Sequence, residues 1–168
     1  MNSIDRREAI LRLLRDTNKA IKGIDLANKF GVTRQIIVKD IAILRAKGSN
    51  IIATPDGYIY NIDKNRVRSI IAVKHSEDKM IEELEIVIKY GGIIENVIIE
   101  HPLYGEIIGN IMIRNLNDLN MFEESFKNAN AKPLSKITND IHLHTISADT
   151  QEDIECIKKE LKESGFAL

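Results

Sequence analysis

The chain has 168 residues, and 43% of them are hydrophobic, enough to form real cores in one domain or in two small ones. No run is long and apolar enough to span a bilayer, and the charged residues near the start argue against a signal peptide, so we expect no membrane partner. The single cysteine, Cys156, excludes an internal disulfide framework and favours a reducing, cytoplasmic location.

The formal net charge of −1 hides an uneven distribution along the chain. Residues 1–64 contain 12 Lys and Arg against 7 Asp and Glu, whereas residues 65–168 contain 12 against 18. A basic segment followed by an acidic one is typical of a nucleic-acid-binding domain joined to a second module. We therefore predict a DNA-binding domain over residues 1–64 and a second domain over residues 65–168, with a linker at Asp63–Arg66.

The basic segment predicts three helices and a hairpin. Pro55-Asp56-Gly57 between two β-prone runs is a strong turn signal, because proline fixes φ and glycine supplies a positive φ. The expected elements are a helix with Ser3 as its N-cap, a helix over Gly23–Phe30 ended by Gly31, a helix from Thr33 to Gly48, and strands over residues 50–54 and 58–61. This order is typical of a winged helix-turn-helix.

The third of these helices has two different faces. Ile37, Ile41 and Leu44 form one apolar stripe, and the Thr33 hydroxyl is expected to cap the helix. The opposite face consists mostly of Arg34, Gln35, Val38, Lys39 and Ala42. An ordinary amphipathic helix would look the same, but within a helix-turn-helix this face suits the DNA major groove.

Arg34, Gln35 and Lys39 are therefore the expected contacts to base edges. The other basic side chains, which are either phosphate contacts or solvated charges, are Arg6, Arg7, Lys22 and Arg45. One such domain covers few base pairs, so we expect a homodimer that reads two half-sites of double-stranded operator DNA.

The acidic segment predicts the order strand, helix, strand, strand, helix, strand, helix. The expected elements are strands over residues 67–75, 94–100, 106–113 and 140–147, and helices that begin at Ser76, at Asn117 or Asp118, and at Thr150. The first six elements match the split βαβ arrangement of ferredoxin-like folds, an α/β sandwich, to which the last helix is an addition. The expected fold class is α+β, with the first and last strands as neighbours.

All four histidines lie in the acidic segment. His142 and His144 are two residues apart on a predicted strand, so both project from one face, which suits two ligands of one metal ion, although a chance surface pair is commoner. His75 ends the strand expected beside them. A carboxylate of the following helix could complete the set, and imidazole with carboxylate suits zinc, nickel, iron or manganese. The candidate carboxylates are Glu82, Glu83 and Glu85.

Residues 26–48, LANKFGVTRQIIVKDIAILRAKG, resemble the winged-helix domain of the biotin-repressor type. The shared pattern is a Thr-Arg pair that opens the recognition helix, followed by Ile, Asp-Ile, Leu-Arg and Gly. The pattern occurs across many bacterial regulators, so it implies DNA binding without identifying the signal.

The acidic segment resembles the 3H domain, a family named for its histidines. The matching motifs are His75, Glu83-Leu84, VIIEHPLYGEI over residues 97–107, Phe122, Pro133–Ser135 and IHLHTI over residues 141–146. Thr138–Asp140 stands where the family often has a Gly-rich turn. Together with the winged helix, the resemblance covers nearly the whole chain and extends to nicotinate-responsive repressors of NAD-biosynthesis and niacin-uptake genes.

The resemblance implies a metal site and an effector. In that family the 3H domain binds nickel or zinc through positions that correspond to His75, Glu83, His142 and His144, and nicotinic acid acts as co-repressor. We therefore expect a metal-containing repressor in which the acid lies at the metal. Its expected neighbours are His101 and Tyr104, which otherwise read as turn residues in contact with each other.

Two alternatives remain open at this point. In the first, the metal ion itself is the signal to the regulator. In the second, the chain is a metal-dependent enzyme with a DNA-binding appendage, since open-site zinc can activate water. The sequence shows no nucleophile elbow, phosphate-binding Gly loop or HExxH motif, so we expect no enzyme.

Overall fold

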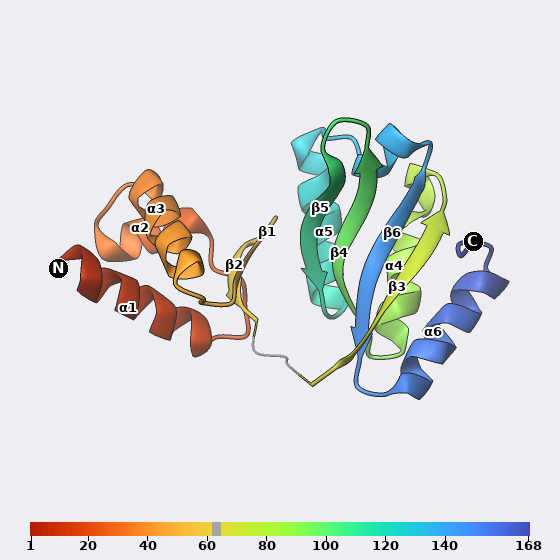
Figure 1. Ribbon diagram of the computed structural model, residues 1–168, viewed down its shortest axis with the longest axis horizontal. Coiled ribbons are helices and arrows are strands. Elements are labelled where there is room, and N and C mark those ends of the chain that lie inside the picture. The colour runs from red at the N-terminus through yellow and green to blue at the C-terminus, as the bar shows by residue number, and fades with distance from the viewer. Residues whose placement is uncertain (62–64) are drawn as a thin grey trace. The chain divides into compact units, whose positions relative to one another are not determined.

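The computed structural model describes residues 1–61 and 65–168, which belong to two compact units, Met1–Lys64 and Asn65–Leu168. Asp63 and Lys64 of the expected linker at Asp63–Arg66 lie outside the described residues. Among the described helices, none has the length and apolar character needed to cross a membrane. Each unit has its own apolar core. Figure 1 shows the elements that form each unit.

The first unit is a winged helix-turn-helix, as predicted. Its elements are α1 (Ser3–Arg15), α2 (Gly23–Phe30), α3 (Arg34–Ala46), β1 (Ile51–Thr54) and β2 (Gly57–Tyr60). The two strands pair antiparallel to form the wing. The apolar stripes of the three helices meet in one core, which includes Ile10, Leu14, Leu26, Ile37, Ile41 and Leu44.

Local signals set the helix ends in this unit. The Thr33 hydroxyl accepts from the backbone N–H of Ile36 at 3.4 Å, so the expected cap of α3 is confirmed. Gly31 ends α2 in the left-handed region at φ +63°. The N-cap of α1 was expected at Ser3 and is Asn2, whose side chain accepts from two backbone N–H groups at 2.9 Å. Asparagine and serine cap equally well, so the sequence did not separate them.

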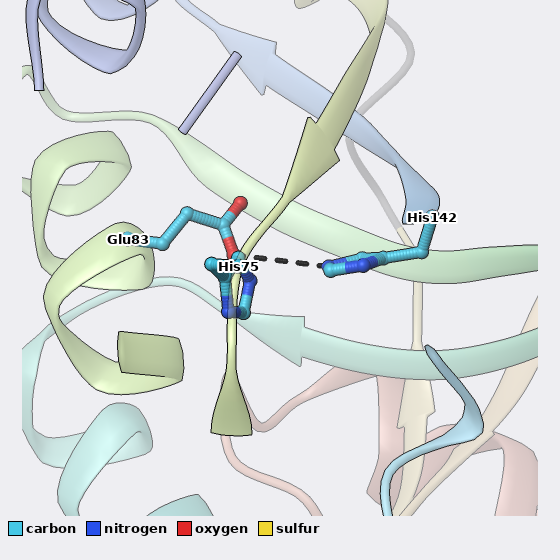
Figure 2. Close-up of side chains that lie close together, drawn as sticks. All are labelled: His75, Glu83 and His142. Atoms are coloured by element: carbon cyan, nitrogen blue, oxygen red, sulfur yellow. Dashed lines mark hydrogen bonds and ion pairs between the residues drawn. The ribbon is translucent and has the colours of Figure 1, made fainter. Parts of the chain in front are cut away.

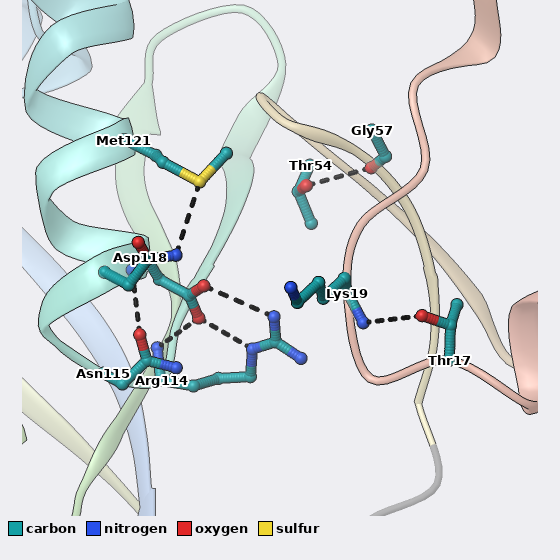
Figure 3. Close-up of polar contacts among 9 residues, drawn as sticks. Thr17, Lys19, Thr54, Gly57, Arg114, Asn115, Asp118 and Met121 are labelled. Carbon is teal, nitrogen blue, oxygen red and sulfur yellow. Dashed lines mark hydrogen bonds and ion pairs between the residues drawn. The ribbon is translucent and has the colours of Figure 1, made fainter. Parts of the chain in front are cut away.

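The wing is joined to the segment before α2. Ile21 and Tyr58 exchange two backbone hydrogen bonds, at 2.8 and 3.0 Å. A Cβ atom at Gly57 would lie 2.4 Å from the Ile21 carbonyl oxygen, so this close approach requires glycine. The Thr54 hydroxyl donates to the Gly57 carbonyl at 2.9 Å and closes the turn (Figure 3).

The second unit is a four-stranded antiparallel sheet with helices on one face (Figure 1). Its strands are β3 (Val67–Lys74), β4 (Ile93–His101), β5 (Gly105–Ile113) and β6 (Ile141–Ala148). Its helices are α4 (Met80–Lys89), α5 (Leu116–Ala129) and α6 (Gln151–Glu163). Apolar residues of the helices and of the covered sheet face form one core, so the α+β class with a last added helix is confirmed.

The strand order is β3-β6-β4-β5, and every neighbouring pair is antiparallel. The first and last strands of the unit are neighbours, as expected. A ferredoxin-like sheet has its first and third strands as the central pair, whereas here β6 and β4 form it. The difference places the largely buried β6 inside the sheet. It also leaves β3 at an edge, where residues 166–168 pair with it.

Three element boundaries differ from the expectation. A 3₁₀ turn, η1 (Glu77–Lys79), precedes α4, and the Ser76 side chain makes no capping bond. Helix α5 is capped by Asn115 rather than by Asn117 or Asp118, because the Asn115 side chain accepts from the Asp118 N–H at 2.9 Å (Figure 3). A second 3₁₀ helix, η2 (Leu134–Thr138), was not predicted.

Candidate metal centre and nucleic-acid interface

Two paired strands and one helix bring three histidines to one acid. His142 and His144 occupy every second position of β6 together with the core residues Ile146 and Ala148, so all four side chains lie on the helix-covered face of the sheet. In the pairing of β3 with β6, Val73 lies opposite His142, and His75 follows directly after the end of β3. Glu83 points at them from the first turn of α4. Figure 2 shows His75, Glu83 and His142 turned toward one another.

The ring nitrogens converge on the Glu83 carboxylate. The Nε2 atom of His75 lies 2.8 Å from Oε2, and that of His142 lies 3.9 Å from the same oxygen. The Nε2 atom of His144 lies 3.4 Å from Oε1. Ligand atoms of His75, Glu83 and His142 all lie within 4.8 Å of one another. The four side chains are at most 6% exposed, so the cluster is largely shielded from bulk water.

Backbone carbonyls fix the orientation of all three rings. The Nδ1–H groups of His75, His142 and His144 donate to the carbonyl oxygens of Ser76, Asp140 and Asn96 at 2.8, 3.0 and 2.8 Å. A carbonyl can only accept, so these contacts assign the proton to Nδ1 and leave Nε2 as the inward-facing atom. Ligating histidines in proteins are held in the same way.

Burial and neighbouring charge set the protonation of the cluster. Burial alone would raise the pKa of Glu83, but the charge and close approach of His144 and the hydrogen bond from His75 lower it to about 2. Burial and the charge of His144 lower the pKa of His142 to about 4. Burial also works to lower the pKa of His75 and His144, yet contact with Glu83 outweighs it and raises both. Metal binds an ionised carboxylate and neutral imidazoles, so an ion would compete with the protons that the raised pKa values of His75 and His144 favour.

One oxygen of the Glu83 carboxylate lacks a hydrogen bond within the described part of the chain. The Oε1 atom of Glu83 is buried without a hydrogen-bond partner among the residues that the structure describes. Leaving a buried charged oxygen unpaired is costly, and a cation between the carboxylate and the Nε2 atoms would remove that cost. His75, Glu83 and His142 therefore fit a divalent metal by donor chemistry as well as by position, and His144 contacts the other oxygen of Glu83.

A pocket of about 520 Å³ adjoins the cluster on one side. Pairing between β4 and β6 ends at Ile98 and Leu143, so the strands separate beyond that point, and His142 forms part of the pocket wall together with Glu100, Glu106 and Thr138. His101 and Tyr104 are not among the described lining residues. They contact each other in the β4–β5 turn, where His101 Nδ1 accepts from the Leu103 N–H at 3.1 Å.

The expected DNA contacts all lie on the surface of α3 or at its cap. Thr33, Arg34, Gln35, Lys39 and Arg45 are exposed. On the opposite side of the helix Asp40 is 2% exposed, and it binds Arg6 Nε at 2.6 Å and Arg7 Nη1 at 3.2 Å. These two arginines, which the sequence left as phosphate contacts or solvated charges, tie α1 to the recognition helix.

Sequence reasoning missed two supports of the cluster. Asn96 lies at a β-bulge in β4, and the bulge aims its carbonyl at His144 while its side chain accepts from the Thr145 N–H. The Phe166 ring meets the His75 ring edge-on at 5.7 Å between centroids. Neither role had a signal in the sequence, because one uses a backbone atom and the other a contact between distant segments.

A winged helix-turn-helix joined to a unit with a buried ligand cluster defines a DNA-binding transcription regulator. Residues 6–59 match the family model of an HTH domain, and residues 68–168 match that of the 3H domain. The probable transcription repressor NiaR of Thermotoga maritima is 41% identical over 164 residues, which cover 98% of this chain and 94% of the relative. The transcription repressor NadR of Bacillus subtilis is 33% identical over 168 residues, with 98% and 93% covered.

The chain therefore belongs to the 3H-domain family of transcription repressors. It is a repressor with a helix-turn-helix DNA-binding domain and not an enzyme, which removes the alternative of a metal-dependent enzyme.

Proposed function

We propose that this repressor is a homodimer that holds a divalent transition metal, nickel or zinc, and controls genes of NAD biosynthesis and niacin transport with nicotinic acid as co-repressor. The observation that carries the metal is the convergence of three Nε2 atoms on a buried carboxylate with an unpaired oxygen. The effector and the target genes are supported by the resemblance of both domains to the nicotinate-responsive repressors.

Each residue of the cluster has a distinct role in the proposal. His75, His142 and His144 supply neutral nitrogen donors, and Glu83 supplies the negative charge. When bound, the ion supplies a Lewis-acidic position that a carboxylate can ligate. His142 lies between the cluster and the 520 Å³ pocket, so a small acid in that pocket would meet the cluster there. His101 and Tyr104 remain the proposed outer neighbours of the acid.

The proposed DNA contacts follow from the exposed face of α3. Arg34, Gln35 and Lys39 contact base edges, Arg45 contacts phosphate, and the Thr33 cap fixes the start of the helix. The sheet face that carries no helix exposes Ile70 and Ile108, which supports a partner surface on the second unit. Two copies are needed to read two half-sites.

Metal analysis of purified protein tests the ligand set. The wild type is expected to bind one ion per chain, and the double variant His142→Ala, His144→Ala none. His101→Ala is the matched control, because it removes a histidine of the same unit outside the cluster, and it should keep the full metal content. Retained metal in the double variant would reject these ligands.

Operator titration with and without nicotinic acid tests the effector. We expect the acid to tighten binding of the metal-loaded repressor by about fivefold or more. A change of less than about twofold would reject nicotinic acid as co-repressor. The near-complete burial of the four side chains favours one alternative, in which the ion itself is the signal. Operator binding that depends on metal and ignores the acid would support that alternative.

A further inference from the structure

An apolar side chain stands in the middle of the recognition face of α3. Val38 is 42% exposed, and it lies on the exposed face next to the buried stripe, about 100° around the helix from Ile37 and about 60° from Ile41, both of which are buried in the core. Folding gives no reason for this choice. Exposure forgoes the gain from burying the side chain, and a β-branched residue lowers helix propensity. An exposed valine at this place is therefore a candidate for a functional contact.

The neighbours of Val38 are those of a base-reading surface. Arg34 and Ala42 lie one turn before and one turn after it, and Gln35 and Lys39 lie beside it, all of them exposed. The strip formed by Val38 and Ala42 is thus bordered by positive and hydrogen-bonding groups that suit phosphates and base edges. Val38 also lies within the first two turns of the helix, the part that contacts bases in helix-turn-helix proteins.

The face is held in place from its buried side. Asp40 is enclosed in the unit and bound by Arg6 and Arg7 of α1, so the helix cannot easily rotate about its axis. A fixed rotation is what a side chain with one rigid torsion needs in order to meet the same atom of DNA in every complex.

We propose that Val38 is a specificity-determining residue that packs against the C5 methyl group of a thymine in the major groove. The thymine methyl is an apolar group displayed on the major-groove edge of a base, and an apolar side chain recognises it by contact. Each half-site of the operator therefore carries a thymine at the position facing Val38. This inference rests on DNA binding by the helix-turn-helix domain and is independent of the metal and the effector.

Replacement of thymine by uracil tests the proposal, because it removes only the methyl group. The probe is a duplex selected from random-sequence DNA by the wild-type protein, with deoxyuridine substituted for one thymidine at a time. For the wild type, one thymine position in each half-site should lose about fourfold in affinity, the effect of one buried methyl-sized group. Uracil at every other thymine should change affinity by less than twofold.

Val38→Ala supplies the second arm of the test. Alanine favours the helix, so this exposed substitution should leave the circular dichroism spectrum and thermal midpoint unchanged. The variant should bind the thymine duplex about fourfold more weakly than the wild type and should no longer distinguish thymine from uracil at the sensitive position. Ile36→Ala is the matched control, since Ile36 is 37% exposed on the same helix but lies about 160° around it from Val38.

Three results would overturn the inference. One is a wild type that binds every uracil duplex as tightly as the thymine duplex. Another is a Val38→Ala variant that keeps the full preference for thymine. The third is an Ile36→Ala variant that loses the preference to the same extent as Val38→Ala, because the loss would then reflect a general disturbance of α3.

Discussion

Among the described residues each of the two units buries one acidic side chain, and the two acids are compensated differently. In the first unit Asp40 is 2% exposed, and each of its oxygens binds an arginine, Arg6 or Arg7. In the second unit Glu83 is fully buried, its neighbours are imidazoles, and its Oε1 atom has no hydrogen-bond partner among the described residues. Both oxygens of Asp40 are hydrogen-bonded, whereas in the described part of the chain Oε1 of Glu83 has only the His144 ring nitrogen near it, at 3.4 Å.

The difference separates a structural ion pair from a ligand site. A guanidinium carries a permanent charge and presents only donors, so Asp40 and its arginines leave no position for a ligand. An imidazole can present a neutral nitrogen lone pair, so the ring nitrogens around Glu83 can turn from hydrogen bonding to coordination. Burial of an acid is therefore not a functional signal by itself; the chemistry of its partners decides.

The largest effect is expected from Glu83→Gln. Glutamine keeps the shape but removes the negative charge of the cluster, and we expect affinity for nickel or zinc to fall by about a hundredfold or more, measured by competition with a chromogenic chelator. Asp40→Asn, the equivalent change in the other unit, should leave the affinity unchanged. Equal loss in both variants would show that the two buried acids do not differ in their contribution to metal binding.

The next effect concerns stability in the first unit. Asp40→Asn leaves two guanidinium groups facing a neutral amide, and we expect it to lower the free energy of unfolding by about 3 kcal/mol, since breaking a buried ion pair uncovers the remaining charge. Urea unfolding measures this change. Asp25→Asn, at an exposed acid of α2, should stay within about 0.5 kcal/mol of the wild type. A similar effect for both variants would show that Asp40 contributes only surface charge.

A third effect is the loss of folding stability of the metal-free protein at acidic pH. The pKa of His142 is about 4 in the folded chain and near 6.5 when unfolded, so the unfolded state takes up a proton first, and stability falls as the pH falls from 6.5 to 4. Glu83 extends the loss from pH 4.5 to about 2. His75 and His144 have raised pKa values and act oppositely, losing stability as the pH rises above 6.5.

Replacing His142 isolates the contribution of this residue to the loss of stability at acidic pH. In urea unfolding with a chelator present, His142→Gln should lose less stability than the wild type between pH 6.5 and 4. Identical slopes for the two proteins would contradict the lowered pKa of His142.

The smallest effect is expected from Arg66, a largely buried arginine of the second unit. Arg66 is 13% exposed and donates to Asp149 at 2.5 Å and to the Gly91 carbonyl at 2.6 Å. We expect Arg66→Ala to cost about 1–2 kcal/mol in urea unfolding. Arg68→Ala, which removes a more exposed arginine that binds Glu95, should cost below about 0.5 kcal/mol. A larger loss of stability for Arg68→Ala than for Arg66→Ala would show that burial of the arginine does not determine how much each contributes to stability.

The sequence indicated most elements because their signals are local. Thr33 and Gly31 mark helix ends through their own hydroxyl and conformational freedom, and the Pro-Asp-Gly turn sets the wing. The sequence did not identify Asn2 and Asn115 as the N-caps, because a residue close to each of them has an equally good capping side chain. The order of the central strands depends on pairing between distant segments, which no local pattern encodes.

The candidate cluster was likewise predictable from the sequence only in part. The spacing of His142 and His144 placed both on one face, and the neighbouring strands brought His75 to them. From spacing alone Glu82, Glu83 and Glu85 were equivalent, and the fold selects Glu83, which is buried and turned inward. The carbonyls that orient the rings could not be predicted, since every residue has one and only the fold decides where it points.

The pairing of residues 166–168 with the edge of β3 has a practical consequence for purification. The N–H of Leu168 donates to the Ala72 carbonyl, and the neighbouring Phe166 ring touches His75. An oligohistidine tag fused directly after Leu168 would begin three residues after Phe166, whose ring contacts His75 of the cluster. The tag would therefore bring competing imidazoles close to the cluster. Metal stoichiometry should therefore be measured on protein whose tag is carried at the other end or has been cleaved off.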